Sequence, residues 1–272
     1  MLGAIIGDIV GSIWEFKRIK HKDFPLFAEH NTFTDDTIMT MAVADALLNN
    51  LDPATTMRSW ARNVKIVPRG VEIGGYGQKF FFWLSAPNVL PAYHSFGNGG
   101  AMRVSPAAFL ASSLDECLQN ARRVTEVTHD HPEGLRGALA TSHAIYLALQ
   151  NEPPTTIRAV ISKYYNYDLS KSVEEIRPDY ERSETAQGSV PESLVCALEA
   201  KDYEDAIRNA VSLGGDTDTM AAIAGGLAEA LFGIPDEIKT EGLSYLNDEM
   251  KALLHQFDRI TDELRHCRQP RG

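Results

Sequence analysis

The sequence Gly3-Ala4-Ile5-Ile6-Gly7-Asp8-Ile9-Val10-Gly11-Ser12 predicts a helix that carries two separate rows of residues. Large apolar residues recur at helical spacing, at positions Leu2, Ile5, Ile6, Ile9 and Ile13. Glycines form a second row at i, i+4 and i+8, at positions Gly3, Gly7 and Gly11. Because each glycine costs a helix interior about 1 kcal/mol relative to alanine, this row indicates a close approach by another helix or by a ligand. We favour tight packing against another helix.

Helical periodicity continues through most of the chain. It predicts helices over residues 34–50, 113–128, 132–150, 155–167, 191–200, 203–213, 216–232 and 253–264. Alternating strand patterns are scarce, and residues 79–84 form one weak strand candidate. Three long connections, 17–33, 65–77 and 84–102, suggest functional surface. Because no repeat, linker or charge block marks a boundary, the sequence predicts a compact all-α bundle, with residues 1–272 as a single domain.

The composition is that of an ordinary globular protein, with 44% hydrophobic and 23% charged residues. Its net charge of −11 disfavours nucleic acid and anionic membrane surfaces as partners. No apolar run reaches the roughly 18 residues of a membrane span, and the first residues lack the features of a signal peptide. The cysteines Cys117, Cys196 and Cys267 show neither disulfide nor zinc-ligand spacing. We therefore expect a cytoplasmic protein, and a monomer, because no repeated apolar surface stripe stands out.

Two helix starts are rich in aspartate, Thr34-Asp35-Asp36 and Gly214-Gly215-Asp216-Thr217-Asp218-Thr219. Taken alone, each is explained as a helix N-terminus whose acids complement the helix dipole. If the two starts converge in space, four carboxylates would face one another, which repulsion and desolvation forbid unless protons or cations neutralise them. Since every candidate ligand atom is oxygen, Mg²⁺, Mn²⁺ or Ca²⁺ fits this cluster, whereas Zn²⁺ and copper do not.

Two further segments could bind a ligand. Residues 95–104, Ser-Phe-Gly-Asn-Gly-Gly-Ala-Met-Arg-Val, form either an ordinary turn or a loop whose backbone N–H groups approach a phosphate or sugar. This loop matches neither a Walker A motif nor a dinucleotide-binding fingerprint. Residues 127–134, Val-Thr-His-Asp-His-Pro-Glu-Gly, place His129 and His131 at a helix boundary. A structural role is the simpler explanation for both histidines, and donation to a sugar hydroxyl or phosphate oxygen is the alternative.

Together these segments resemble the ADP-ribosylglycohydrolase family, whose members remove ADP-ribose from modified side chains or related acceptors. Five motifs occur in the family's order, at residues 3–12, 33–37, 97–103, 128–132 and 214–219. The resemblance covers residues 1 to about 235. Each motif is weak by itself, but five motifs in one order are specific.

The resemblance implies an orthogonal helical bundle with two Mg²⁺ or Mn²⁺ ions at its centre. The implied metal ligands are the oxygen-bearing residues of the two helix starts, Thr34, Asp35, Asp36, Asp216, Asp218 and Thr219. The implied binding positions for the ADP-ribose diphosphate and the adjoining ribose are Gly97, Asn98, Gly99, Gly100, Ala101, Met102, Arg103 and His129. Glu15 matches the family's acidic residue near the substrate ribose.

The implied reaction is metal-dependent hydrolysis of an N- or O-glycosidic bond at C1″ of ADP-ribose, through an oxocarbenium-like state. We expect catalytic roles for Asp36, which with the other aspartates tunes the attacking water, and for Glu15, as a base or a clamp on the leaving group. The implied partner is an ADP-ribosylated protein or a small-molecule ADP-ribose conjugate. Because the Thr-His-x-His-Pro motif at 128–132 also resembles arginine-directed members, a modified arginine is the favoured acceptor.

Two other functions stay open at this point. Adjacent His and Asp residues form the metal-binding core of HD-type phosphohydrolases, so His129-Asp130 could play that part, with His94 and Asp216 as remote ligands. That interpretation leaves Thr34-Asp35-Asp36 without a role. The other alternative is a module that binds ADP-ribose without cleaving it, which the complete metal set disfavours.

Overall fold

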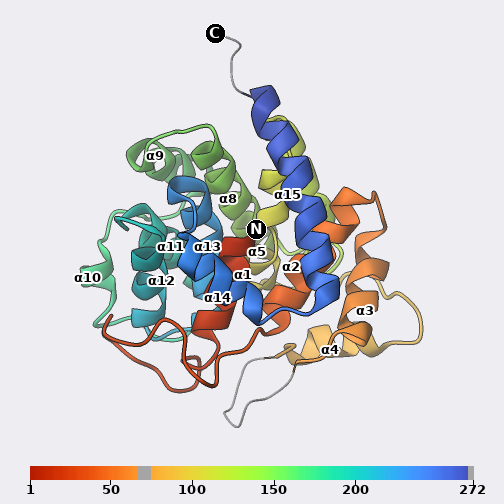
Figure 1. Ribbon diagram of the computed structural model, residues 1–272, viewed down its shortest axis with the longest axis horizontal. Helices are drawn as coiled ribbons and strands as arrows, with labels where there is room; N and C mark the ends of the chain where they lie inside the picture. Colours follow the sequence, from red (N-terminus) through yellow and green to blue (C-terminus); the bar gives the residue numbers. More distant parts are fainter. Residues whose placement is uncertain (67–74, 269–272) are drawn as a thin grey trace.

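The computed structural model describes residues 1–66 and 75–268, with side chains described as far as Leu264. Within these residues the chain forms fifteen helices and no β-strand, apart from one isolated antiparallel bridge between Gly97 and Thr185. The helices pack into the compact body of Figure 1, which confirms the all-α prediction. In chain order they are α1 (Leu2–Gly11), α2 (Asp35–Leu48), α3 (Pro53–Asn63), α4 (Gln78–Ser85), α5 (Gly99–Met102), α6 (Ser105–Phe109), α7 (Leu114–Thr125), α8 (Pro132–Leu149), α9 (Pro154–Tyr165), α10 (Val173–Ile176), α11 (Ala186–Leu198), α12 (Tyr203–Ser212), α13 (Thr217–Phe232), α14 (Asp236–Ser244) and α15 (Asp248–Arg268).

The glycine row of α1 packs directly against α13. A Cβ atom added at Gly3, Gly7 or Gly11 would lie only 2.4, 2.0 or 2.3 Å from a backbone oxygen of α13. Every residue of α1 is buried, and the hydroxyl of Tyr203 at the start of α12 donates to the carbonyl of Gly3 at 2.7 Å. Larger side chains at these three positions would hold the backbones of α1 and α13 apart. The glycine row therefore sets the distance between the two helices. The predicted packing of one helix against another is confirmed.

Residues 79–84 are helical, so the expected strand there is wrong. They belong to α4, in which Phe80, Trp83 and Leu84 are buried at positions i, i+3 and i+4. Phe81 and Phe82 are 54% and 63% exposed. A strand would bury every second residue instead. The buried residues of this segment therefore follow the spacing of a helix and not that of a strand.

The other expected helices are present with shifted ends. α11 begins at Ala186 rather than at Pro191, and the proline lies inside the helix. Proline inside a helix removes one N–H donor and crowds the carbonyl four residues earlier. Because most residues of α11 are buried, we attribute the persistence of the helix to its packing. α3 was not expected, although its start carries clear signals. The carboxylate of Asp52 accepts a hydrogen bond from the backbone of Thr55, and Pro53 occupies the first turn.

Of the three long connections, 65–77 lies mostly outside the described residues. The connection 17–33 is irregular and is fixed to the second half of the chain. The ammonium group of Lys20 donates to three backbone carbonyls near α10 and the end of α12, at 2.8, 2.6 and 2.7 Å. This anchor fixes the segment that follows α1, and with it the neighbourhood of Glu15.

One cluster of buried apolar side chains extends from α1 to α15. It agrees with a single domain, which stays a prediction. Across residues 1–66 and 75–268, no helix is both long enough and apolar enough to cross a lipid bilayer.

Candidate active site

A cavity of about 510 Å³ lies where the starts of α2 and α13 meet α4, α5 and the segment that follows α1. This is within the size range of small-molecule sites. Twelve of the predicted site residues line it, namely Glu15, Asp35, Asp36, Gly97, Asn98, Gly99, Met102, Arg103, His129, Asp216, Asp218 and Thr219. A larger cavity of about 720 Å³ beside α8, α13 and α15 contains none of them. We therefore place the candidate site in the first cavity.

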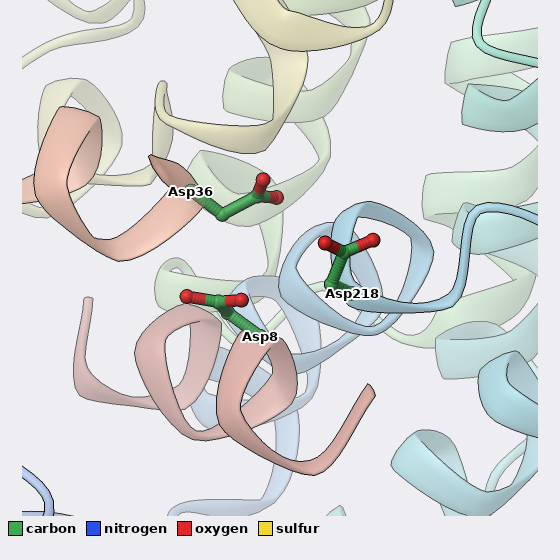
Figure 2. Close-up of side chains that lie close together, drawn as sticks. All are labelled: Asp8, Asp36 and Asp218. Atoms are coloured by element: carbon green, nitrogen blue, oxygen red, sulfur yellow. The ribbon is translucent and has the colours of Figure 1, made fainter. Parts of the chain in front are cut away.

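Two overlapping sets of carboxylates lie at this site. Asp8 of α1, Asp36 of α2 and Asp218 of α13 point toward one another (Figure 2), with one ligand oxygen from each within 4.8 Å of the others. Glu15, Asp216 and Asp218 form a second set with the same spacing limit. The two aspartate-rich helix starts therefore converge. Because Asp218 belongs to both sets, two cations held by them would be neighbours.

Asp8, which lies within the motif at residues 3–12 but is given no role by the sequence, holds the start of α2 against α1. Its carboxylate accepts hydrogen bonds from the backbone N–H groups of Thr34 and Thr37 at 2.9 and 3.0 Å. It also accepts from the two hydroxyl groups, at 2.7 and 2.5 Å. The signal in the sequence is a single acid on an otherwise apolar helix, because a buried acid is costly unless it is paired.

Glu15 lies just beyond α1, where the chain turns through a hydrogen bond from the N–H of Trp14 to the carbonyl of Gly11. Its side chain is 5% exposed, and its Oε1 accepts a hydrogen bond from Arg182. Its Oε2 is buried without a hydrogen-bond partner among the described residues. Burial, with the nearby charge of Asp216, raises the pKa of Glu15 to about 7, although Arg182 opposes the shift.

Burial raises the pKa of every aspartate in the cluster. The pKa of Asp8 rises to about 6, against the hydrogen bonds that lower it. The pKa of Asp35 rises to about 7, because burial and then the charge of Asp8 disfavour ionisation. For Asp36 and Asp218 burial is again the main cause, neighbouring carboxylates add to it, and the pKa lies well above its ordinary value of 3.8. Without cations to neutralise them, ionised carboxylates in this cluster lower the stability of the folded protein at neutral pH.

Divalent cations fit this cluster. Oδ1 of Asp36 and Oε2 of Glu15 are buried, and no donor within the described part of the chain reaches them. Buried anionic oxygens without donors are costly, and a cation would satisfy both. The ligand atoms on offer are carboxylate oxygens, which suit hard ions such as Mg²⁺ and Mn²⁺.

Three of the predicted metal ligands lie outside the two carboxylate sets. The hydroxyl oxygen of Thr34 accepts a hydrogen bond from the backbone of Asp36 at 3.2 Å, so this residue caps α2. The hydroxyl of Thr219 donates to the sulfur of Met102 at 3.6 Å. Asp35 lines the cavity but belongs to neither carboxylate set. Direct ligation of a cation by these three residues stays a prediction.

Asp216 is oriented by two donors. Its Oδ2 accepts a hydrogen bond from the amide of Asn98 at 2.7 Å, and its Oδ1 accepts from Arg182 at 3.3 Å. Asn98 thereby joins the glycine loop to the carboxylate cluster. Arg182 was not among the expected site residues, since a lone arginine in a polar stretch before α11 carries no motif.

Only part of the glycine loop faces the cavity. A Cβ atom at Gly99 would lie 3.1 Å from Nε2 of His129 on the cavity side. A Cβ atom at Gly100 would instead lie 2.9 Å from the methyl group of Thr125 in α7. Gly100 and Ala101 are buried and do not line the cavity. The side-chain positions of both residues therefore pack against protein, and contact of their backbone N–H groups with a substrate stays a prediction.

His129 presents a neutral imidazole, because burial lowers its pKa well below 6.5. Its Nδ1 lies 2.8 Å from the hydroxyl of Thr128, which accepts a hydrogen bond from Arg103 at 2.7 Å. That hydroxyl can give its own proton to Nδ1, which favours the tautomer with the N–H at Nε2. Nε2 lies beside Gly99, so His129 can donate to a ligand there.

Arg103 is fully buried and borders the same part of the cavity. Burial lowers its pKa to about 10, and its guanidinium lies 5.5 Å from the ring centre of Phe80. Its Nε and Nη1 have no hydrogen-bond partner among the residues the structure describes. A buried cation with two unused donors fits an anionic ligand.

Comparison with known proteins supplies the family. The family model for ADP-ribosylglycohydrolase matches residues 1–270. The chain belongs to the ADP-ribosylglycohydrolase family. Family membership and the names of its relatives indicate an ADP-ribosyl hydrolase.

Two curated relatives of this chain match it over most of its length. ADP-ribosylhydrolase ARH3 of Danio rerio is 24% identical, over 93% of this chain and 88% of that protein. ADP-ribosylarginine hydrolase Tri1 of Pseudomonas putida (strain GB-1) is 27% identical, over 97% of this chain and 79% of that protein. A solved structure, an ADP-ribosylglycohydrolase-related protein complex, shares the fold with a TM-score of 0.70 and 24% identity, over 96% of this chain and 97% of that one.

Proposed function

We propose that this ADP-ribosylglycohydrolase is a metal-dependent enzyme that hydrolyses the C1″ glycosidic bond between ADP-ribose and an acceptor. The observation that carries the proposal is the pair of carboxylate sets sharing Asp218, on the same cavity as the glycine loop. One side of the cavity offers carboxylate oxygens for cations, and another offers N–H donors for an anion. A diphosphate joined to a sugar matches both.

The cations would be held by Asp8, Asp36 and Asp218 on one side and by Glu15, Asp216 and Asp218 on the other. When bound, two divalent cations supply Lewis-acid activation of water and orientation of the sugar hydroxyls. Asp36 would tune the attacking water, because its buried Oδ1 has no hydrogen-bond donor among the described residues.

The diphosphate would lie against Arg103, His129 and Gly99. Arg103 offers unused guanidinium donors, His129 offers its Nε2–H, and the absent side chain of Gly99 leaves room for the ligand. The adjoining ribose would then extend over the carboxylates toward Glu15. Where the second cation is held by Asp216 and Asp218 without Glu15, the Oε2 of Glu15 would accept a proton from the incoming water, or hold the leaving group in place.

The HD-type alternative has little support from the geometry. The side chain of Asp130 is 40% exposed and lies 3.6 Å from His94, which is itself 65% exposed. Neither these two residues nor His129 belongs to a carboxylate set identified among the described residues. The pair His129-Asp130 is therefore split between the buried cavity and the surface.

The test uses protein freed of metal ions with a chelator. ADP-ribosylated arginine, ADP-ribosylated serine and O-acetyl-ADP-ribose are each added with and without Mg²⁺ or Mn²⁺, and the release of free ADP-ribose is measured. We expect cation-dependent release and a loss of about 10²-fold or more in Asp218→Asn, which damages both carboxylate sets. Asp168→Asn, which removes one exposed acid, is the matched control. Cation-independent turnover, or full activity of Asp218→Asn, would refute the proposal. Binding of ADP-ribose without release from any conjugate would leave a binding module.

A further inference from the structure

Lys20, in the irregular connection that follows α1, donates to carbonyl groups from two distant parts of the chain. Its Nζ lies 2.8 Å from the carbonyl oxygen of Arg177, 2.6 Å from that of Tyr180 and 2.7 Å from that of Leu213. Arg177 and Leu213 are the C-cap residues of α10 and α12. Helix ends leave carbonyl groups without intrahelical donors, and the three N–H groups of a lysine satisfy such acceptors. One side chain therefore closes two helix ends and the loop after α10.

Each of the three segments joined in this way carries a charged group of the candidate site. The connection after α1 contains Glu15, five residues before the lysine. The carbonyl of Tyr180 lies two residues before Arg182. The carbonyl of Leu213 lies three residues before Asp216. Because Arg182 pairs with both of these acids through its Nη2, the three segments meet again at the second carboxylate set.

The glycine turn at residues 214–215, directly before Asp216, packs against this anchor. At the first glycine, whose φ is +65°, an added Cβ atom would lie 2.9 Å from the carbonyl oxygen of Ile19 and 3.3 Å from Cε of Lys20. At the second, an added Cβ atom would lie 2.5 Å from the ring of Tyr180. Since these contacts leave the turn little space, they determine the position of Asp216 at the start of α13.

The first carboxylate set is held by other contacts. Its members belong to α1, α2 and α13, which are joined by the hydrogen bonds of Asp8 and by the glycine row of α1. The three carbonyl groups that accept from Lys20 belong to none of these helices. A change at Lys20 should therefore act on the second set and leave the first in place.

We propose that Lys20 is a positioning residue for the second carboxylate set and sets the affinity of that set for a divalent cation. The inference rests on the proposed function, in which this set holds one of two cations. Lys20 is not among the described residues that line the cavity, so it acts through the backbone on Arg182 and Asp216. Groups that orient metal ligands in this way contribute about 10–100-fold to metal affinity.

The experiment measures Mn²⁺ binding to metal-free Lys20→Met by titration calorimetry. This substitution removes the ammonium group and keeps most of the length of the side chain. We expect two binding events in the unmodified protein. In the variant, one event should be weakened about tenfold and the other should stay within about twofold. Half-maximal activity should likewise require about tenfold more Mn²⁺, with most of kcat recovered at saturation, whereas a protein that is merely less stable would show the ordinary Mn²⁺ dependence.

Lys22→Met is the matched control. Lys22 lies in the same connection, and its ammonium group pairs with the carboxylate of Asp205 in α12 instead of the carbonyl groups that precede the site. Arg208 donates to the carbonyl groups of Lys22 and Phe24 at 2.9 and 2.6 Å, so the connection stays attached to α12 in both variants. We expect Lys22→Met to bind Mn²⁺ as the unmodified protein does, even where its Tm is lower.

Lys20→Ala allows chemical rescue, and it replaces Lys20→Met if that variant does not fold. Ammonium ion has the charge and the N–H donors of the lost group, whereas tetramethylammonium has the charge and no donor. Because Lys20 is an exposed residue, an ion from solution can reach its position. At equal ionic strength, ammonium chloride should restore part of the Mn²⁺ affinity and tetramethylammonium chloride should not.

Three results would overturn the inference alone. Unchanged Mn²⁺ affinities in Lys20→Met would show that the carbonyl contacts do not position the second set. Equal weakening of both binding events, or the same weakening in Lys22→Met, would indicate a general loss of structure. Equal effects of the two salts on Lys20→Ala would attribute the change to ionic screening. A single Mn²⁺ binding event in the unmodified protein, or none, would instead refute the two-cation site of the proposed function, and this inference with it.

Discussion

Repulsion among the buried carboxylates of the candidate site should make the metal-free protein less stable as the pH rises. Burial raises the pKa of Asp35 from 3.8 to about 7. A carboxyl whose pKa is raised by folding adds stability that is fully present below its unfolded pKa and is lost as the pH rises through the folded one. For Asp35 alone, these two values give a loss of about 3 kcal/mol in unfolding free energy between pH 5 and pH 8.

This loss converts into a measurable shift in Tm. With an unfolding entropy of about 2.1 cal/mol/K per residue over 272 residues, about 3 kcal/mol corresponds to about 5 °C. His129 acts in the opposite direction, because burial lowers its pKa and protonation at low pH therefore destabilises the fold. The pH profile of the unmodified protein thus mixes both effects, and a variant is needed to separate them.

Asp35→Asn isolates the carboxyl, because it removes the charge at nearly constant shape. In chelator at pH 8, calorimetry should show the variant to be more stable than the unmodified protein, and this difference in Tm should be about 5 °C smaller at pH 5. Saturating Mn²⁺ should reduce or reverse this difference in Tm between Asp35→Asn and the unmodified protein. A ligand at a hundred times its Kd stabilises a protein that binds it by about 2.7 kcal/mol, and we expect the unmodified protein to bind Mn²⁺ more tightly than the variant. A lower Tm for Asp35→Asn in chelator at pH 8 would refute the reasoning.

Three further outcomes follow from the packing around the site. Gly7→Val should lower the unfolding free energy by about 3 kcal/mol or more in urea titrations, since its Cβ would lie 2.0 Å from a carbonyl of α13. Gly77→Val, whose Cβ has no atom of the described residues within 4 Å, should stay within about 0.5 kcal/mol, and equal losses would contradict the packing argument. Gly99→Val should weaken ADP-ribose binding about tenfold by calorimetry, and unchanged affinity would move the diphosphate elsewhere. Thr37→Val should lower stability by about 1.5–3 kcal/mol, because it removes a hydroxyl donor to the Asp8 carboxylate, and an unchanged urea midpoint would show that this bond contributes nothing.

Local sequence was sufficient wherever a helix supplies its own geometry. A spacing of four residues places Gly3, Gly7 and Gly11 on one face of α1, and this follows from helical periodicity alone. The aspartates at the starts of α2 and α13 likewise follow from capping and dipole preferences. The oxygen-only composition of these two starts was enough to exclude soft metals.

Contacts between segments far apart in the chain could not be predicted from local sequence patterns. Asp8 enters the cluster because four donors of Thr34 and Thr37, at the start of α2, converge on it, and Arg182 enters because the segment before α11 runs past Glu15. The predicted strand at 79–84 is wrong for the same reason. Which of its aromatic residues are buried depends on the elements that pack against this segment, and these lie elsewhere in the chain. A sequence fixes which side chains share a helix face, because the backbone repeat is local. Which faces meet, and therefore which charges share a cavity, depends on packing between elements far apart in the chain.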